Sequence, residues 1–104
     1  MAEIQLVLTS VGTRADADRL ARAMVEQRLA ACVHIEVIDS VYRWQGAVRQ
    51  EPEFRLLLKT SAQRHAALID ALRAAHPYEL PALVTLHSHD VTPDYARWVA
   101  EQTR

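Results

Sequence analysis

Two long segments that meet at Gln45-Gly46 constrain the fold of this chain more than any other feature. In the first, residues 30–44, apolar and polar positions alternate as in a strand, and a bend or bulge is expected at Asp39-Ser40. The second, residues 48–60, returns after the turn, and Pro52 marks an irregular or edge segment because proline cannot donate to a ladder. The sequence therefore predicts a long β-hairpin that overhangs any compact core.

Helical and strand patterns flank the hairpin. Residues 3–9 predict a first strand, and Thr13 is expected to cap a helix of roughly four turns. Ser61 is expected to cap a second helix, residues 62–75, that Pro77 ends. Residues 83–89 predict a fourth strand, and Thr92-Pro93-Asp94 starts a short last helix. The expected apolar positions are Leu20, Met24, Val25 and Leu29 in the first helix, Ala66, Leu68, Ile69 and Leu72 in the second, and Tyr95, Trp98 and Val99 in the last.

The resulting order is β-α-β-β-α-β with an added helix. This order predicts an α+β fold of the ferredoxin-like type, an antiparallel sheet with two helices on one face, in a single domain of residues 1–104. The overhanging hairpin would leave a long strand edge uncovered, which proteins avoid. We therefore expect an oligomer closed by strand pairing.

Composition excludes several classes of partner. Acids and bases nearly balance to a net charge of −1 without a basic stripe, so nucleic acid is not expected. The first ten residues carry neither a basic leader nor an apolar stretch long enough for a span, so no membrane partner is expected and the location is predicted to be cytosolic. A single cysteine, Cys32, cannot form an internal disulfide.

The stretch HPYELP, residues 76–81, has two interpretations. His76 and Glu79 carry donors that suit Cu(II), Zn or Ni, with Tyr78 as a hydrogen-bonding wall. Alternatively, Pro77 and Pro81 make a stiff corner in which the polar groups hold the backbone.

Other candidate ligands lie on the expected strands. Cys32 is a small hydrophobe or a soft ligand for copper, and His34 shares its strand face. His87 and His89 have the i, i+2 spacing that lets two imidazoles share a metal, or they decorate an exposed strand end.

Several large side chains have open roles. Tyr42 and Trp44 alternate on the hairpin and Trp98 lies on the last helix, where they line a ligand groove or, as we favour, pack against neighbouring subunits. Lys59, at the end of its strand, meets an anionic ligand or an intersubunit carboxylate.

Five segments together resemble the CutA family, the divalent-cation tolerance proteins. They are RLAACVHI (28–35), YRWQG (42–46), Glu53 with LLLKT (56–60), HPYELP (76–81) and PDYARWV (93–99). Their order and spacing cover nearly the whole chain. The chain departs from the family pattern at His34, where relatives commonly carry Asn, and at His87-Ser88-His89 and Val91.

The resemblance implies a ferredoxin-like protomer, a homotrimer assembled through the sheets, a cytoplasmic setting and a role tied to copper and other divalent cations. The residues that match recurrent family positions are Cys32, Tyr42, Trp44, Lys59, His76, Tyr78, Glu79 and Trp98. Among these, the resemblance implies Cys32, His76 and Glu79 as the metal or small-ligand positions.

Two functions follow as hypotheses, and a third is weighed against them. The first is a trimeric metal-binding protein for copper and divalent-cation tolerance. The second is a trimeric regulatory or scaffold module that binds a small molecule or a protein at subunit clefts, without catalysis. An enzyme is not expected, because no third group is seen to orient Cys32 with His34 or His76.

Overall fold

The computed structural model describes residues 3–104, which form four strands and three helices. In chain order these are β1 (Gln5–Val11), α1 (Arg14–Glu26), β2 (Cys32–Trp44), β3 (Ala47–Thr60), α2 (His65–Ala75), β4 (Val84–His87) and α3 (Pro93–Gln102). The strands form one antiparallel sheet in the order β2-β3-β1-β4. The predicted α+β class and the predicted order of elements are confirmed.

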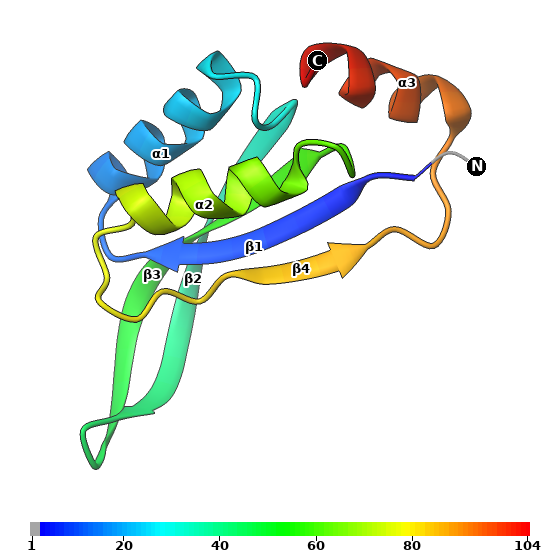
Figure 1. The fold of residues 1–104 in the computed structure, drawn as a ribbon. Helices are drawn as coiled ribbons and strands as arrows, with labels where there is room; N and C mark the ends of the chain where they lie inside the picture. Colours follow the sequence, from blue (N-terminus) through cyan, green and yellow to red (C-terminus); the bar gives the residue numbers. More distant parts are fainter. Residues whose placement is uncertain (1–2) are drawn as a thin grey trace.

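Helices α1 and α2 lie on one face of the sheet (Figure 1). Every second residue of β1 is buried, as expected for a strand with one covered face. Val7 and Val11 pack there with Leu20 of α1 and Leu72 of α2, and all four side chains are fully buried. We call the opposite side, which neither α1 nor α2 covers, the open face.

The hairpin of β2 and β3 extends far beyond the helices (Figure 1). Its register is unbroken from Cys32↔Lys59 to Trp44↔Ala47, so the bulge expected at Asp39-Ser40 is absent. Asp39 is exposed, and the Ser40 hydroxyl donates to Glu53 at 2.6 Å from within the regular ladder, so neither side chain needs a bulge. Pro52 does lie on an edge segment, because the pairing of β3 with β1 ends at Phe54.

A two-residue turn closes the hairpin. Gln45 and Gly46 have φ of 51° and 80°, the left-handed pair of a type I′ turn, whose twist matches that of the flanking strands. Gly46 tolerates this backbone conformation without the steric cost that a side chain would add.

The helix boundaries differ from the prediction. Helix α1 ends at Glu26, because Arg28 takes a left-handed φ of 59° and its guanidinium bonds the carbonyl of Glu101 at 2.9 Å. Leu29 is still buried, but Val25 is 42% exposed and lies outside the core. Thr13 caps the helix as predicted, accepting from the N–H of Asp16 at 3.1 Å.

In the second half of the chain, helix α2 and strand β4 are both shorter than the expected residues 62–75 and 83–89. Helix α2 begins at His65 without a side-chain cap, and Ser61 Oγ instead lies 3.0 Å from the Thr103 hydroxyl. Ala66 faces solvent, while Leu68 and Leu72 are buried as predicted. Val99 of α3 packs in a second small cluster, and Trp98 remains 40% exposed beside Tyr95.

Candidate functional site at the base of the hairpin

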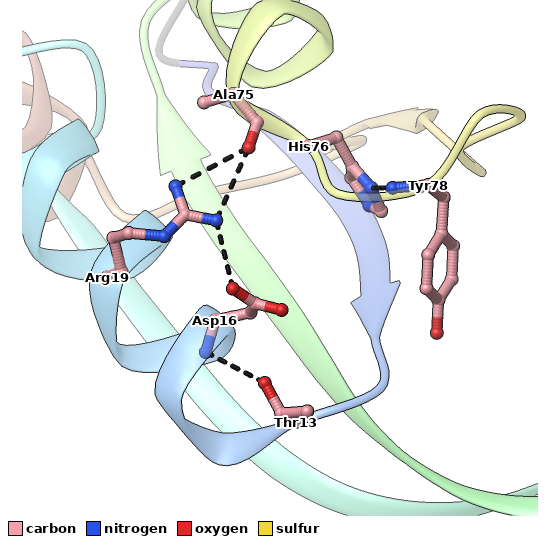
Figure 2. A network of polar contacts seen from close by, with 6 residues as sticks. All are labelled: Thr13, Asp16, Arg19, Ala75, His76 and Tyr78. Carbon is pink, nitrogen blue, oxygen red and sulfur yellow. Dashed lines mark hydrogen bonds and ion pairs between the residues drawn. The ribbon is translucent and has the colours of Figure 1, made fainter.

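The first turn of α1 holds the corner that follows α2. The Arg19 guanidinium donates to the Asp16 carboxylate at 3.1 Å and to the carbonyl of Ala75 at 3.4 Å (Figure 2). Because Ala75 is the last residue of α2, this bridge fixes where HPYELP starts. The stiff-corner interpretation of this stretch therefore agrees with the contacts around it.

Both ring nitrogens of His76 have partners within the chain. The N–H of Tyr78 donates to Nδ1 at 3.1 Å, and Nε2 lies 3.0 Å from the hydroxyl of Thr9. A neutral ring with its proton on Nε2 satisfies both contacts. Burial lowers the pKa of His76 below its ordinary 6.5, in keeping with a neutral imidazole. A metal at His76 would have to displace one of these bonds.

Tyr78 connects the corner to the hairpin. Its hydroxyl donates to Oε2 of Glu53 at 2.7 Å, and the hydroxyl of Ser40 donates to Oε1 at 2.6 Å. Desolvation, followed by the hydrogen bond to Glu53, raises the pKa of the Tyr78 phenol above its ordinary 10.0. Gly12 makes room for this phenol, since a Cβ there would lie 3.3 Å from the Tyr78 oxygen.

A cleft of about 560 Å³ opens between the corner and the hairpin. Its lining residues are Ser10, Tyr42, Trp44, Glu51, Glu53, Pro77, Tyr78, Glu79, Leu80 and Ala82. The wall combines three carboxylates with three aromatic rings, and no Lys, Arg or His is among its residues. Its volume lies within the range of small-molecule sites, about 300–1,000 Å³.

Cys32 and His34 form a separate pair of metal donors. Cys32 Sγ and His34 Nε2 are 3.5 Å apart on the open face of β2, as the shared strand face predicted. Glu36, the next residue on this face, binds Arg55 at 3.1 Å and is not directed at the pair. Lys59, opposite Cys32 in the ladder, donates to the Tyr95 hydroxyl at 3.3 Å, and its contact with an anionic ligand or an intersubunit carboxylate stays a prediction.

Only one of the two histidines expected on the last strand lies in it. Strand β4 ends at His87, so His89 lies beyond it and the expected i, i+2 strand geometry does not hold. The chain leaves the ladder at Ser88, whose hydroxyl accepts from the N–H of Ile4 at 2.9 Å.

The structure separates the three metal positions that the resemblance implied. Cys32 lies on the open face in line with Leu6, whereas His76 contacts Thr9, which is buried on the helix side of β1. Glu79 lines the cleft. Within residues 3–104, no three His, Cys, Asp or Glu side chains come together as a metal site. Ligation by this set stays a prediction that needs donors from more than one chain.

Glu53 is the site residue that sequence reasoning came nearest to missing. Its place in the cleft depends on a hydrogen bond to Tyr78, 25 residues away in the chain. Charged residues are common in the outer half of β3, where Glu51 and Arg55 flank Glu53, so its carboxylate is a weak local signal, and Glu53 enters the sequence argument only as part of a family match.

These features define the class: a small α+β domain with a four-stranded antiparallel sheet, an overhanging hairpin and a ligand-sized cleft at the hairpin's base. The chain belongs to the CutA family, because a family model described as CutA1 divalent ion tolerance protein matches residues 5–102. The family is named for divalent-cation tolerance, and its members are not named as enzymes.

Individual relatives agree with this assignment. The chain is 39% identical over 100 residues to the divalent-cation tolerance protein CutA of Thermus thermophilus, covering 95% of this chain and 97% of that protein. It is 39% identical over 88 residues to protein CutA of Mus musculus, covering 84% of this chain and 50% of the mouse protein. The structure of CutA from Synechococcus elongatus superimposes with a TM-score of 0.95 at 39% identity, covering 100% of this chain and 93% of that one.

Proposed function

We propose that this protein binds divalent cations, copper foremost, as a homotrimer, and that it acts in metal tolerance. Family membership supports the tolerance role. The observation that carries the metal site is the contact of Cys32 Sγ with His34 Nε2 at 3.5 Å. A thiolate beside an imidazole suits copper and zinc rather than the harder cations magnesium and calcium.

Two donors from one chain make an incomplete site. Structural zinc sites use four ligands, and copper sites use a comparable protein set. The remaining donors in this proposal come from a neighbouring copy, and His76 and Glu79 remain candidates for that role.

Exposed valines on the hairpin support the assembly. Val37, Val41 and Val48 lie on the helix-side face of the hairpin and are 67%, 65% and 64% exposed. β2 is also the outer strand of the sheet, so its edge is open to another chain. A homotrimer that pairs this edge and covers these valines would hold the overhang against a second copy.

Titration of the reduced, tag-free protein with Cu(I), Cu(II) and Zn tests the proposal. Native mass spectrometry gives the subunit count. We expect saturable binding at a fixed ratio per trimer, lost in Cys32→Ser and His34→Gln and retained in His87→Gln. His76→Ala shows whether the corner contributes a ligand. Binding that is weak and unchanged in Cys32→Ser and His34→Gln would refute the site, and a monomeric mass would refute the trimer.

The cleft favours a second candidate function, a regulatory or scaffold module that binds a small molecule without catalysis. Its volume of about 560 Å³ and its aromatic wall are the supporting observations. This function predicts that metal leaves the protein's stability unchanged while a metabolite raises it.

We propose binding rather than catalysis at Cys32. A nucleophilic cysteine needs a base that a third group orients, and the neighbouring carboxylate of Glu36 is held by Arg55. Slow, unperturbed reaction of the thiol with an alkylating reagent is expected, and fast reaction would refute this.

The location is proposed to be cytoplasmic. A single cysteine without a disulfide partner in the chain suits a reducing compartment. Within residues 3–104, no helix is both long and apolar enough to cross a membrane. Cell fractionation with an antibody to the chain tests the compartment.

A further inference from the structure

The cleft has a charge that selects among ligands. Glu51, Glu53 and Glu79 line it, and none of its lining residues is basic. After desolvation, the negative charges of Glu51 and Glu53 raise the pKa of the Tyr42 phenol, while Arg49 across the ladder opposes them. An anionic ligand would meet repulsion here, and a cation would meet attraction.

A single metal ion does not suit this wall. The oxygens of Glu53 already accept from Ser40 and Tyr78 at 2.6 and 2.7 Å. Calcium takes six to eight oxygen ligands. Within residues 3–104, the carboxylates of the cleft do not come close enough together to form a group of three metal donors. The space of about 560 Å³ is far larger than one ion requires.

Aromatic and apolar side chains make up most of the remaining wall. Tyr42 and Trp44 of the hairpin are 38% and 41% exposed, and Leu80 of the corner is 72% exposed. Aromatic faces attract a desolvated cation by about 0.5–2 kcal/mol. Leu80 and Pro77 offer contact to a hydrocarbon group. Carboxylates and aromatic rings together thus suit a charged head that carries an apolar body.

We propose that the cleft at the base of the hairpin binds a small organic cation, a protonated amine with an apolar group. The ammonium lies among the Glu51 and Glu79 carboxylates, and its apolar group packs on Tyr42, Trp44 and Leu80. This inference rests on the small-molecule function proposed above and deepens it; it uses Glu79 as a cleft residue, whereas the metal proposal is carried by Cys32 and His34.

Titration by ¹H–¹⁵N NMR tests the proposal with three probes of similar shape. At neutral pH benzylamine is a cation, benzyl alcohol is neutral and benzoate is an anion. The Trp44 indole N–H reports on the cleft and is assigned with Trp44→Phe, while the Trp98 indole on α3 serves as an internal reference. We expect benzylamine to shift the Trp44 signal saturably and to leave the Trp98 signal in place.

Charge should decide the ranking of the probes. Benzyl alcohol is expected to bind about tenfold more weakly than benzylamine, which corresponds to about 1.4 kcal/mol, and benzoate is expected not to bind. Replacing Glu51 and Glu79 together by Gln should weaken benzylamine about tenfold and leave benzyl alcohol unchanged. Glu101→Gln, an exposed change on α3, is the matched control and should have no effect.

Two results would overturn the proposal: equal binding of benzylamine and benzyl alcohol, or no shift of the Trp44 signal by benzylamine at tens of millimolar. The single variants Glu51→Gln and Glu79→Gln keep the test informative if the double variant loses its dispersed spectrum. Cys32→Ser should lose copper and keep benzylamine, so failure of the metal site and failure of the cleft are distinguishable.

Discussion

Removing one oxygen atom from Tyr78 tests whether the corner and the hairpin are joined as the structure describes. In Tyr78→Phe the ring remains, and the hydroxyl that donates to Glu53 at 2.7 Å is lost. A hydrogen bond to a charged group contributes about 1.5–3 kcal/mol. Because Tyr78 is 37% exposed, water replaces part of the lost bond, and we expect a cost of about 1–1.5 kcal/mol.

Urea unfolding at a fixed protein concentration measures this cost, since the stability of an oligomer depends on concentration. For a domain of this size the cost corresponds to a fall in Tm of about 5–10 °C. Tyr95→Phe is the matched control. Its oxygen accepts a longer bond, 3.3 Å, from Lys59, and its loss should cost about 0.5 kcal/mol or less.

The pH dependence gives a second, independent readout. The folded pKa of Tyr78 is raised above its unfolded value of 10.0, so its stabilisation is fully present below pH 10 and is lost as pH rises above that value. Between about pH 9.5 and 11.5 the wild type should therefore lose stability more steeply than Tyr78→Phe. Parallel stability curves over that window, together with equal stability at pH 8, would show that the Tyr78 to Glu53 bond does not hold the corner.

Three further changes probe other parts of the fold. His76→Gln should flatten the fall in thermal midpoint between pH 7.5 and 5, because the folded pKa of His76 lies below its unfolded value of 6.5 and its stabilisation, present above that value, is lost as pH falls; an unchanged slope would contradict this. Leu72→Ala should cost about 2–4 kcal/mol in urea unfolding, against less than about 0.5 kcal/mol for the exposed Leu80→Ala. Gly46→Ala should cost about 1 kcal/mol in the same assay through its φ of 80° alone, since no atom lies within 4 Å of the added Cβ, and no loss would show that the turn relaxes.

Local pattern was enough to predict the fold. Alternation in β2 and β3 and the Gln45-Gly46 turn are set by neighbouring residues, and so the hairpin was predictable. Where helices end was less predictable, because the decisive contacts are distant. Arg28 leaves the helix while bonding carbonyls 73 and 76 residues away, a partnership that no local pattern shows.

In the candidate site, too, positions set by local spacing were predictable and positions set by tertiary contacts were not. Cys32 and His34 were expected on one strand face because a two-residue spacing fixes their side, and the 3.5 Å contact confirms it. His76 was predicted as a ligand from its residue type, but its bonds to Thr9 and to the Tyr78 N–H depend on tertiary packing. The position of Glu53 in the cleft depends on the hydrogen bond from Tyr78 of the corner, a tertiary contact that local sequence does not show.

The positions of the metal pair and the cleft along β2 limit how they can influence each other. At about 3.3 Å per residue, eight residues of strand place His34 and Tyr42 about 26 Å apart. Between them the ladder with β3 is unbroken, so one chain offers no hinge along this path. Coupling needs an element with two arrangements that both ligands bias differently. Within one chain we therefore expect copper and an organic cation to bind independently, and any coupling in a titration with both would have to pass through contacts between chains.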